Sequence, residues 1–157
     1  MAIALSIQQY LEDLCLPFEV MTHDATHTSQ ETAHATAISE NNLAKGVLIR
    51  RKDGYLLAVV PASRQVTLND LGTWLNQTVG LATEEEVAGV FEDCALGAIP
   101  PIAGAYGLPA VVDESLEGFS DVYFEGGDHR TLVHMTGREF QRMMAKFPHG
   151  RFSAPRA

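Results

Sequence analysis

Two apolar runs joined by a tight-turn signal constrain the fold of this chain most strongly. Residues 45–51 and 55–60 are rich in aliphatic side chains, and Asp53-Gly54 lies between them. Asp-Gly is typical of a β-hairpin turn, because glycine readily adopts the positive φ angle that such turns need. Pro61 cannot donate a ladder hydrogen bond and ends the second run. The sequence therefore predicts an antiparallel strand pair as the centre of a sheet.

Helix starts are marked by four capping boxes, in which Ser or Thr precedes Glu or Gln by three residues. They are Ser6–Gln9, Thr28–Glu31, Thr83–Glu86 and Thr136–Glu139. A further helix is predicted from the spacing of Leu68, Leu71 and Leu75, and short strands are predicted over 18–21, 110–112, 122–124 and 131–135. Because the elements do not alternate strictly between strand and helix, they predict an α+β fold with a mixed sheet.

Length and composition are those of one globular domain. The 157 residues, 46% of them hydrophobic, predict a single domain over 1–147 and a flexible tail over 148–157. The N-terminus lacks the basic segment of a signal peptide and no apolar run is long enough to span a bilayer, so we expect a cytoplasmic protein without membrane contact. The net charge of −9 disfavours nonspecific binding to a phosphate backbone, although a local basic patch could contact one nucleic-acid end.

Three segments carry candidate chemistry. Lys45 begins a hydrophobic strand, where its ammonium could contact a phosphate or polarise a carbonyl, although a surface lysine is the simpler interpretation. The Gly97–Pro101 segment is a Gly-x-x-x-Pro loop whose N–H groups could hold an oxyanion, or it is a plain turn. Gly126–His129 joins two predicted strands, so His129 could orient a substrate or simply lie at a hairpin tip.

The recognised motifs for a nucleophile, a metal or a cofactor are missing from the sequence. There is no Gly-x-Ser-x-Gly elbow, and neither Cys15 nor Cys94 lies in a nucleophile or zinc motif. Phosphate-binding loops of the P-loop and dinucleotide kinds are also lacking. We therefore predict neither a metal site nor a cofactor.

Taken together, the ordered motifs resemble the YbaK / prolyl-tRNA-synthetase-associated domain family. The resemblance covers roughly residues 20–145 and rests on the order and spacing of many short motifs. They are His23, Thr28-Ser29-x-Glu31-x-Ala33, Lys45, Leu57–Ala62, Val66-x-Leu68-x-x-Leu71, Leu81-Ala82-x-x-Glu85-Glu86-Val87, Gly97-x-x-x-Pro101, Val112–Leu116 and Val122-Tyr123-Phe124-x-x-Gly127.

This resemblance implies a mixed, partly barrel-like sheet surrounded by helices, and an aminoacyl-tRNA deacylase that hydrolyses the ester of a mischarged tRNA in trans. Ala-tRNA(Pro) or Cys-tRNA(Pro) is the implied type of substrate. Lys45 matches the family's pocket lysine, and Gly97 and His129 complete the implied catalytic group, His129 through positioning. The implied substrate-binding residues are Thr28, Ile99, Pro100, Pro101, Gly127 and Asp128.

Since no nucleophile is evident, water would cleave the ester, and the terminal 2′-hydroxyl of the tRNA would help to place that water. The protein would position the ester and stabilise the oxyanion. The implied partner is the acceptor end of an aminoacyl-tRNA, with an aminoacyl-tRNA synthetase or an elongation factor as a further candidate. A non-catalytic module of the same fold, which binds an aminoacyl group or another small ligand, is the alternative. The oligomeric state is left open.

Overall fold

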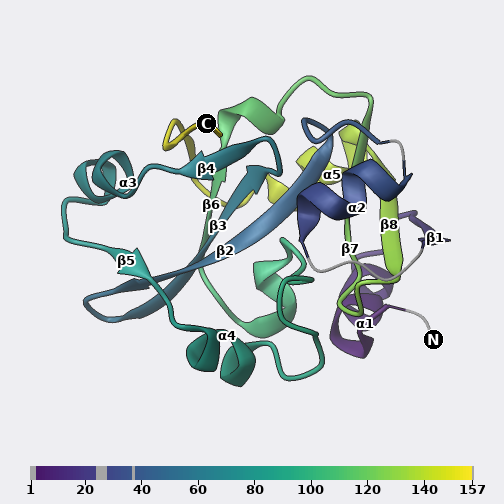
Figure 1. Ribbon diagram of the computed structural model, residues 1–157, viewed down its shortest axis with the longest axis horizontal. Helices are drawn as coiled ribbons and strands as arrows, with labels where there is room; N and C mark the ends of the chain where they lie inside the picture. The colour runs from purple at the N-terminus through teal and green to yellow at the C-terminus, as the bar shows by residue number, and fades with distance from the viewer. Residues whose placement is uncertain (1–2, 24–27, 37, 157) are drawn as a thin grey trace.

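The computed structural model describes residues 3–23, 28–36 and 38–156, in which helices surround a central mixed sheet (Figure 1). The α-helices are α1 (Leu5–Asp13), α2 (Ser29–Thr36), α3 (Leu68–Leu75), α4 (Glu84–Val90) and α5 (Gly137–Met144). The strands are β1 (Glu19–Thr22), β2 (Leu43–Arg51), β3 (Gly54–Pro61), β4 (Arg64–Val66), β5 (Gly80–Leu81), β6 (Ala110–Asp113), β7 (Asp121–Glu125), β8 (Thr131–Thr136), β9 (His149–Gly150) and β10 (Ser153–Pro155). Two short 3-10 helices cover Ala103–Tyr106 and Glu114–Leu116.

The main sheet has the strand order β1-β8-β7-β2-β3-β6-β9, and β5 pairs with β2 beside this path. Three contacts are parallel, namely β2 with β7, β3 with β6 and β6 with β9. The other pairs, including β2 with β3 and β7 with β8, are antiparallel. The predicted α+β class with a mixed sheet is therefore confirmed.

The β2–β3 hairpin is the longest strand pair and crosses the middle of the molecule (Figure 1). Its register runs from Ala44 opposite Pro61 to Arg51 opposite Gly54. Gly54 has a φ of 128°, a conformation that side chains other than glycine rarely adopt, which explains why the tight turn needs glycine here. The predicted hairpin is confirmed, and it provides the frame on which Lys45 is placed.

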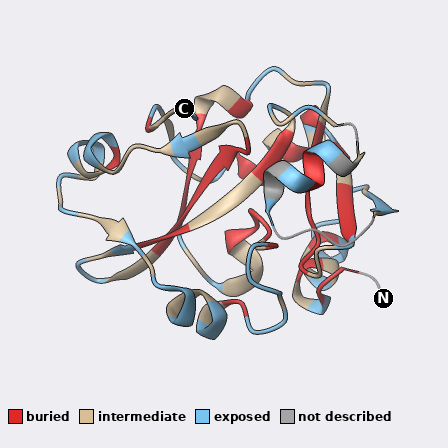
Figure 2. Cartoon of the chain, viewed as in Figure 1, coloured by how far each residue is buried: buried red, intermediate tan, exposed pale blue. Residues whose placement is uncertain are grey.

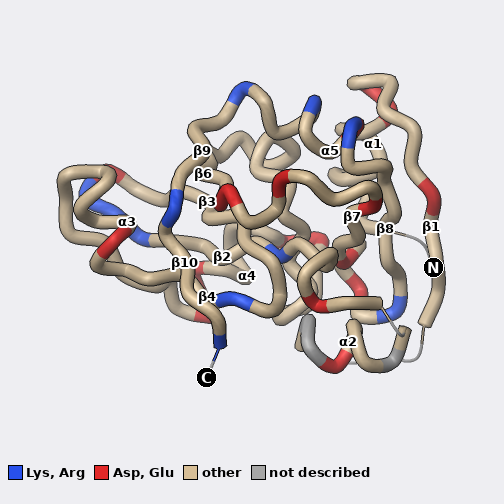
Figure 3. Tube along the Cα trace, turned by 90° about the horizontal axis from the view of Figure 1, so that it is seen from above, with Lys and Arg blue, Asp and Glu red and all other residues tan. Residues whose placement is uncertain are grey.

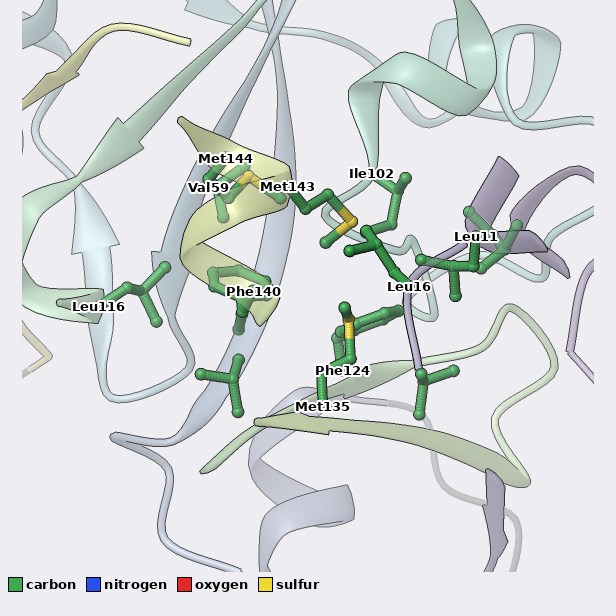
Figure 4. Close-up of a cluster of buried hydrophobic side chains, with 14 of the residues drawn as sticks. Leu11, Leu16, Val59, Ile102, Leu116, Phe124, Met135, Phe140, Met143 and Met144 are labelled. Carbon is green, nitrogen blue, oxygen red and sulfur yellow. The ribbon is translucent and has the colours of Figure 1, made fainter. Parts of the chain in front are cut away.

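The two faces of the β7–β8 part of the sheet are covered by different helices. α1 and α5 pack on one face, where the largest buried cluster joins side chains such as Leu11, Phe124, Phe140 and Met143 (Figures 2 and 4). α2 lies on the other face, where Ala33 packs with Leu43 and Leu132. Because strand side chains alternate between faces, this arrangement decides which residues share the environment of Lys45.

Three of the four predicted capping boxes begin helices. Thr83 accepts a hydrogen bond from the Glu86 N–H and the Glu86 side chain accepts one from the Thr83 N–H. Thr28 and Thr136 likewise accept from the third residue of α2 and α5. The Ser6 prediction is wrong: α1 begins at Leu5, and the Ser6 N–H donates instead to Asp93 at 3.0 Å, because this loop carboxylate lies against the first turn of the helix.

The prediction of a flexible C-terminal tail is also wrong. Within residues 148–156, β9 pairs with β6 and β10 pairs with β4. Phe152 is fully buried and stacks against Trp74 at a centroid distance of 5.8 Å. The Phe152 N–H donates to the Asp113 carboxylate at 3.1 Å. Burial of this aromatic ring stabilises the ordered conformation of the segment, although its composition alone predicts a flexible tail.

Candidate functional site

Lys45 lies on β2 opposite Val60, on the sheet face that α2 also uses. The residues beside it on this face belong to two apolar clusters, Leu43 and Ala62 to one and Ala58 and Val60 to the other. It is half-buried rather than fully exposed. Burial among these side chains lowers the pKa of Lys45 to about 8, with a further lowering by the charge of Arg156 and an opposing effect of Glu40. Its ammonium is therefore poorly solvated, which strengthens its interaction with any bound anion.

The register of β2 and β7 places Glu125 on the same face as Lys45. Leu43 pairs with Tyr123 and Ala44 with Phe124 in the parallel ladder. The next residues along the two strands are Lys45 and Glu125. Each therefore lies one position beyond the last pair of the ladder. Side chains at equivalent positions of neighbouring strands point to the same face.

Glu125 is buried, with 2% of its surface exposed, beneath α2. The Thr32 hydroxyl donates to Oε1 of Glu125, and Nε2 of His23 lies 3.7 Å from Oε2. Burial raises the pKa of Glu125 above its ordinary value, against opposing effects of the Thr32 hydrogen bond and of His23 and His129. This group of polar side chains joins the end of β1, α2 and the end of β7 into one site.

The loop between β7 and β8 is held by its own hydrogen bonds. Asp128 accepts from the Arg130 N–H and from the Thr131 hydroxyl, both at 2.9 Å, so both carboxylate oxygens are used within the loop. Gly127 has a φ of 113°. A Cβ at this position would lie 3.1 Å from Cys94 Sγ, so the loop backbone passes close to Cys94. Among the described residues, Asp128 thus organises the loop that presents His129.

His129 connects this loop to the segment that precedes Gly97. It has a φ of 62°, and its Nε2–H donates to the Leu96 carbonyl. The two loops are also joined by the Ala95 N–H, which donates to the Gly127 carbonyl at 2.6 Å. The structure therefore brings together two of the segments that the sequence singled out, with His129 as the link.

The Gly97–Pro101 loop packs against the backbone of β2 at Gly46, next to Lys45 in the chain. A Cβ on Gly46 would meet the Pro100 carbonyl oxygen at 3.0 Å, so any larger residue would push the loop away from the strand. Pro100 and Pro101 are buried and have no N–H, and the Ala98 N–H donates to Ala95. The N–H groups of Gly97 and Ile99 are left as the candidate oxyanion donors of the loop.

A pocket of about 250 Å³ lies at this edge of β2. Its walls come from Gly46–Leu48, from Leu81 and Ala82 with the first turns of α4, and from Leu96, Gly97 and Ile99. The side chain of Lys45 points to the other face of β2, because its neighbour Gly46 faces the loop. Lys45 and the Gly97–Pro101 loop therefore lie on opposite faces of β2 at the same edge of the strand. Lys45 and Glu125 lie on the same face.

Thr28 directly precedes α2 and is hydrogen-bonded to Thr32. The Glu31 N–H donates to the Thr28 hydroxyl at 3.1 Å, and the Thr32 hydroxyl donates to the Thr28 carbonyl at 3.1 Å. Since Thr32 also binds Glu125, Thr28 belongs to the α2 side of the site.

Cys94 has the wrong electrostatics for a nucleophile. Burial raises the pKa of its thiol to about 12, and Asp93 adds to this effect. Its sulfur lies 3.1 Å from the Tyr106 hydroxyl, which donates to Asp93 at 2.7 Å. Within the described ranges, no group of three or more His, Cys, Asp or Glu side chains is arranged to hold a metal ion.

Sequence reasoning missed Glu125 and Thr32. Glu125 ends a strand and reads as an ordinary exposed acid, and Thr32 is one polar residue in an Ala-rich helix. A weak signal was present, because Phe124 and Glu125 continue the strand pattern in which alternate residues face the two helix layers. Only the β2–β7 register places Glu125 beside Lys45.

Comparison with known proteins shows the family to which the chain belongs. The sequence profile of the aminoacyl-tRNA editing domain matches residues 23–143, and the chain belongs to this family. A candidate trans-editing enzyme for prolyl tRNA synthetase has 25% sequence identity and a TM-score of 0.83, with 96% of each chain covered. The hypothetical protein APE2540 has the same fold, with a TM-score of 0.84 and 22% identity over 95% of this chain and 99% of its own.

Among curated proteins, a proline–tRNA ligase of Fervidobacterium nodosum is 24% identical over 100 residues, which are 63% of this chain. The match spans only 17% of the ligase. In the part of the chain that the structure describes, no helix has the length and apolar character needed to cross a membrane.

Proposed function

We propose that this protein is an aminoacyl-tRNA deacylase that hydrolyses the ester of a mischarged tRNA in trans, in the cytoplasm. Ala-tRNA(Pro) or Cys-tRNA(Pro) is the expected type of substrate. Membership of the editing-domain family supports the reaction class, and the likeness to the candidate prolyl trans-editing enzyme supports the context. The half-buried Lys45 is the observation that carries the proposal, because a poorly solvated cation is suited to a developing negative charge.

Lys45 would stabilise the oxyanion that forms when water attacks the ester carbonyl. The N–H groups of Gly97 and Ile99 border the same strand edge and could add hydrogen bonds from the other side. The attacking water would be placed by the 2′-hydroxyl of the terminal adenosine. No protein nucleophile is needed in this scheme, in keeping with the raised pKa of the Cys94 thiol.

His129 would act by position rather than by proton transfer, since its Nε2–H is engaged by Leu96 and thereby fixes the approach to Gly97. Contact with the tRNA body would be weak. Basic residues are scattered over several elements of the chain (Figure 3), and the chain carries a net charge of −9. An aminoacyl-tRNA synthetase or elongation factor that presents the tRNA would compensate for this.

A panel of tRNAs charged with alanine, serine or cysteine tests the proposal. The wild-type protein should hydrolyse at least one of them, and Lys45→Ala should lose the activity. Lys52→Ala is the matched control, because Lys52 is exposed on the turn of the same hairpin. Hydrolysis of none of the esters would refute the deacylase function, and binding of an aminoacyl-adenosine analogue without turnover would instead support the non-catalytic module. Equal activity of the wild type and Lys45→Ala would refute the role of Lys45.

A further inference from the structure

Lys45 and Glu125 place a basic and an acidic side chain on the same face of the sheet. They follow the paired residues Ala44 and Phe124 on β2 and β7. Hydrogen-bonded strands lie about 5 Å apart, so the two side chains start from neighbouring positions. Both are sheltered from water, Glu125 almost completely.

Among the described residues, no ion pair or hydrogen bond joins Lys45 to Glu125. Oε1 of Glu125 accepts from the Thr32 hydroxyl instead, and its Oε2 lies 3.7 Å from Nε2 of His23. The basic and acidic groups thus lie on the same face without pairing with one another, which suits a ligand that carries both an electron-rich and a cationic group.

An aminoacyl ester is such a ligand, because its carbonyl and its α-ammonium group are attached to adjacent carbon atoms. We propose that Glu125 receives the α-ammonium group of the aminoacyl ester while Lys45 faces the ester carbonyl. This assignment rests on the proposed deacylase function and adds a specificity determinant to it. The substrate class is an ester with a free α-amino group, as distinct from N-acylated or hydroxy-acid esters.

The hydrogen bonds of Glu125 identify the oxygen that binds. Oε1 accepts from the Thr32 hydroxyl of α2, which fixes the orientation of the carboxyl group. Oε2 is buried and accepts no hydrogen bond from the described residues, with His23 Nε2 at 3.7 Å. A buried carboxylate oxygen that lacks a donor is costly, and an ammonium ligand relieves that cost with a charge-assisted hydrogen bond.

A pair of esters that differ only in the α-substituent tests the assignment. Alanyl-tRNA(Pro) and lactyl-tRNA(Pro) have the same size, but the first has an ammonium group where the second has a hydroxyl group. Each enzymatic rate is divided by the spontaneous hydrolysis rate of the same ester, because the ammonium group also activates the ester chemically. If another amino acid proves to be the better substrate, its own α-hydroxy acid replaces lactate.

Wild-type protein should prefer the aminoacyl ester by about 10- to 100-fold, the range expected for a hydrogen bond to a charged group. Glu125→Gln keeps the size and can still accept from Thr32, and it should reduce the preference to less than about 3-fold, chiefly through a higher KM for the aminoacyl ester. Glu85→Gln removes an exposed carboxylate and should leave the preference unchanged.

An equal normalised rate for both esters with the wild-type protein overturns the assignment while the deacylase function stands. Retention of the preference by folded Glu125→Gln overturns it as well. If that variant does not fold, the wild-type comparison decides alone. Failure to hydrolyse either ester, with any amino acid of the panel, overturns the deacylase function and this assignment together.

Discussion

Replacement of Lys45 by methionine should stabilise the protein while removing its activity. The pKa of Lys45 is about 8 in the folded protein against 10.5 for a free lysine, so burial disfavours its charged form. At about 1.4 kcal/mol per pKa unit, this difference corresponds to about 3 kcal/mol. Because the side chain is only half-buried, water screens part of the cost, and we expect Lys45→Met to gain about 1–3 kcal/mol near pH 7.

The gain should depend on pH with a defined sign. Below the folded pKa of about 8, both states of the wild type hold the proton, and the cost is fully present. Between about 8 and 10.5 the folded state releases the proton first, so the wild type becomes more stable relative to Lys45→Met as pH rises. The advantage of the variant should therefore be largest near neutral pH and disappear above about pH 10.5.

Urea denaturation of both proteins near pH 7 and near pH 9.5 measures this difference, and subtraction removes the titration of all shared groups. Lys52→Met is the control, since this exposed residue should change the stability by less than about 0.5 kcal/mol. A variant no more stable than the wild type near pH 7, or one with the same advantage at both pH values, would refute the view that Lys45 carries a desolvated charge.

Three further predictions follow from single contacts. Phe152→Ala should cost about 3–5 kcal/mol in chemical denaturation, because the ring is fully buried, and an effect below about 1 kcal/mol would mean that the C-terminal strand is not part of the core. Gly46→Ala should displace the Pro100 carbonyl, which its Cβ would meet at 3.0 Å, and lower the deacylation rate by about 10-fold or more while the protein stays folded; an unchanged rate would count against a role for this loop. Desolvation of His134 is outweighed by hydrogen bonds to Asp121 and Glu19, which raise its pKa above 6.5, so the stabilisation is present below that value and is lost as pH rises through the raised pKa. His134→Gln should therefore lose most of its stability deficit between about pH 6 and pH 9 in thermal melts, and a constant deficit would contradict this.

Local sequence signals predicted the elements that depend on local physics. The Asp53-Gly54 turn and the capping threonines at 28, 83 and 136 act through neighbouring backbone groups, so their effects are visible within four or five residues. The same rule failed at Ser6, where a carboxylate 87 positions away in the chain takes the N–H of that residue. It failed again after residue 147, where burial of Phe152 overrides a composition rich in Pro, Gly and Arg.

The order of short motifs in the sequence also determined the family and directed attention to Lys45, the Gly97 loop and His129. What the sequence could not determine is which of these residues share a surface. Lys45 and Glu125 are 80 positions apart, and they face the same side only because β2 and β7 pair in parallel with Leu43 opposite Tyr123. A shift of one residue in that register would turn Glu125 toward α1 and α5. The low pKa of Lys45 likewise arises from apolar side chains of several strands, so only the tertiary structure makes this lysine different from the exposed Lys52 on the same hairpin.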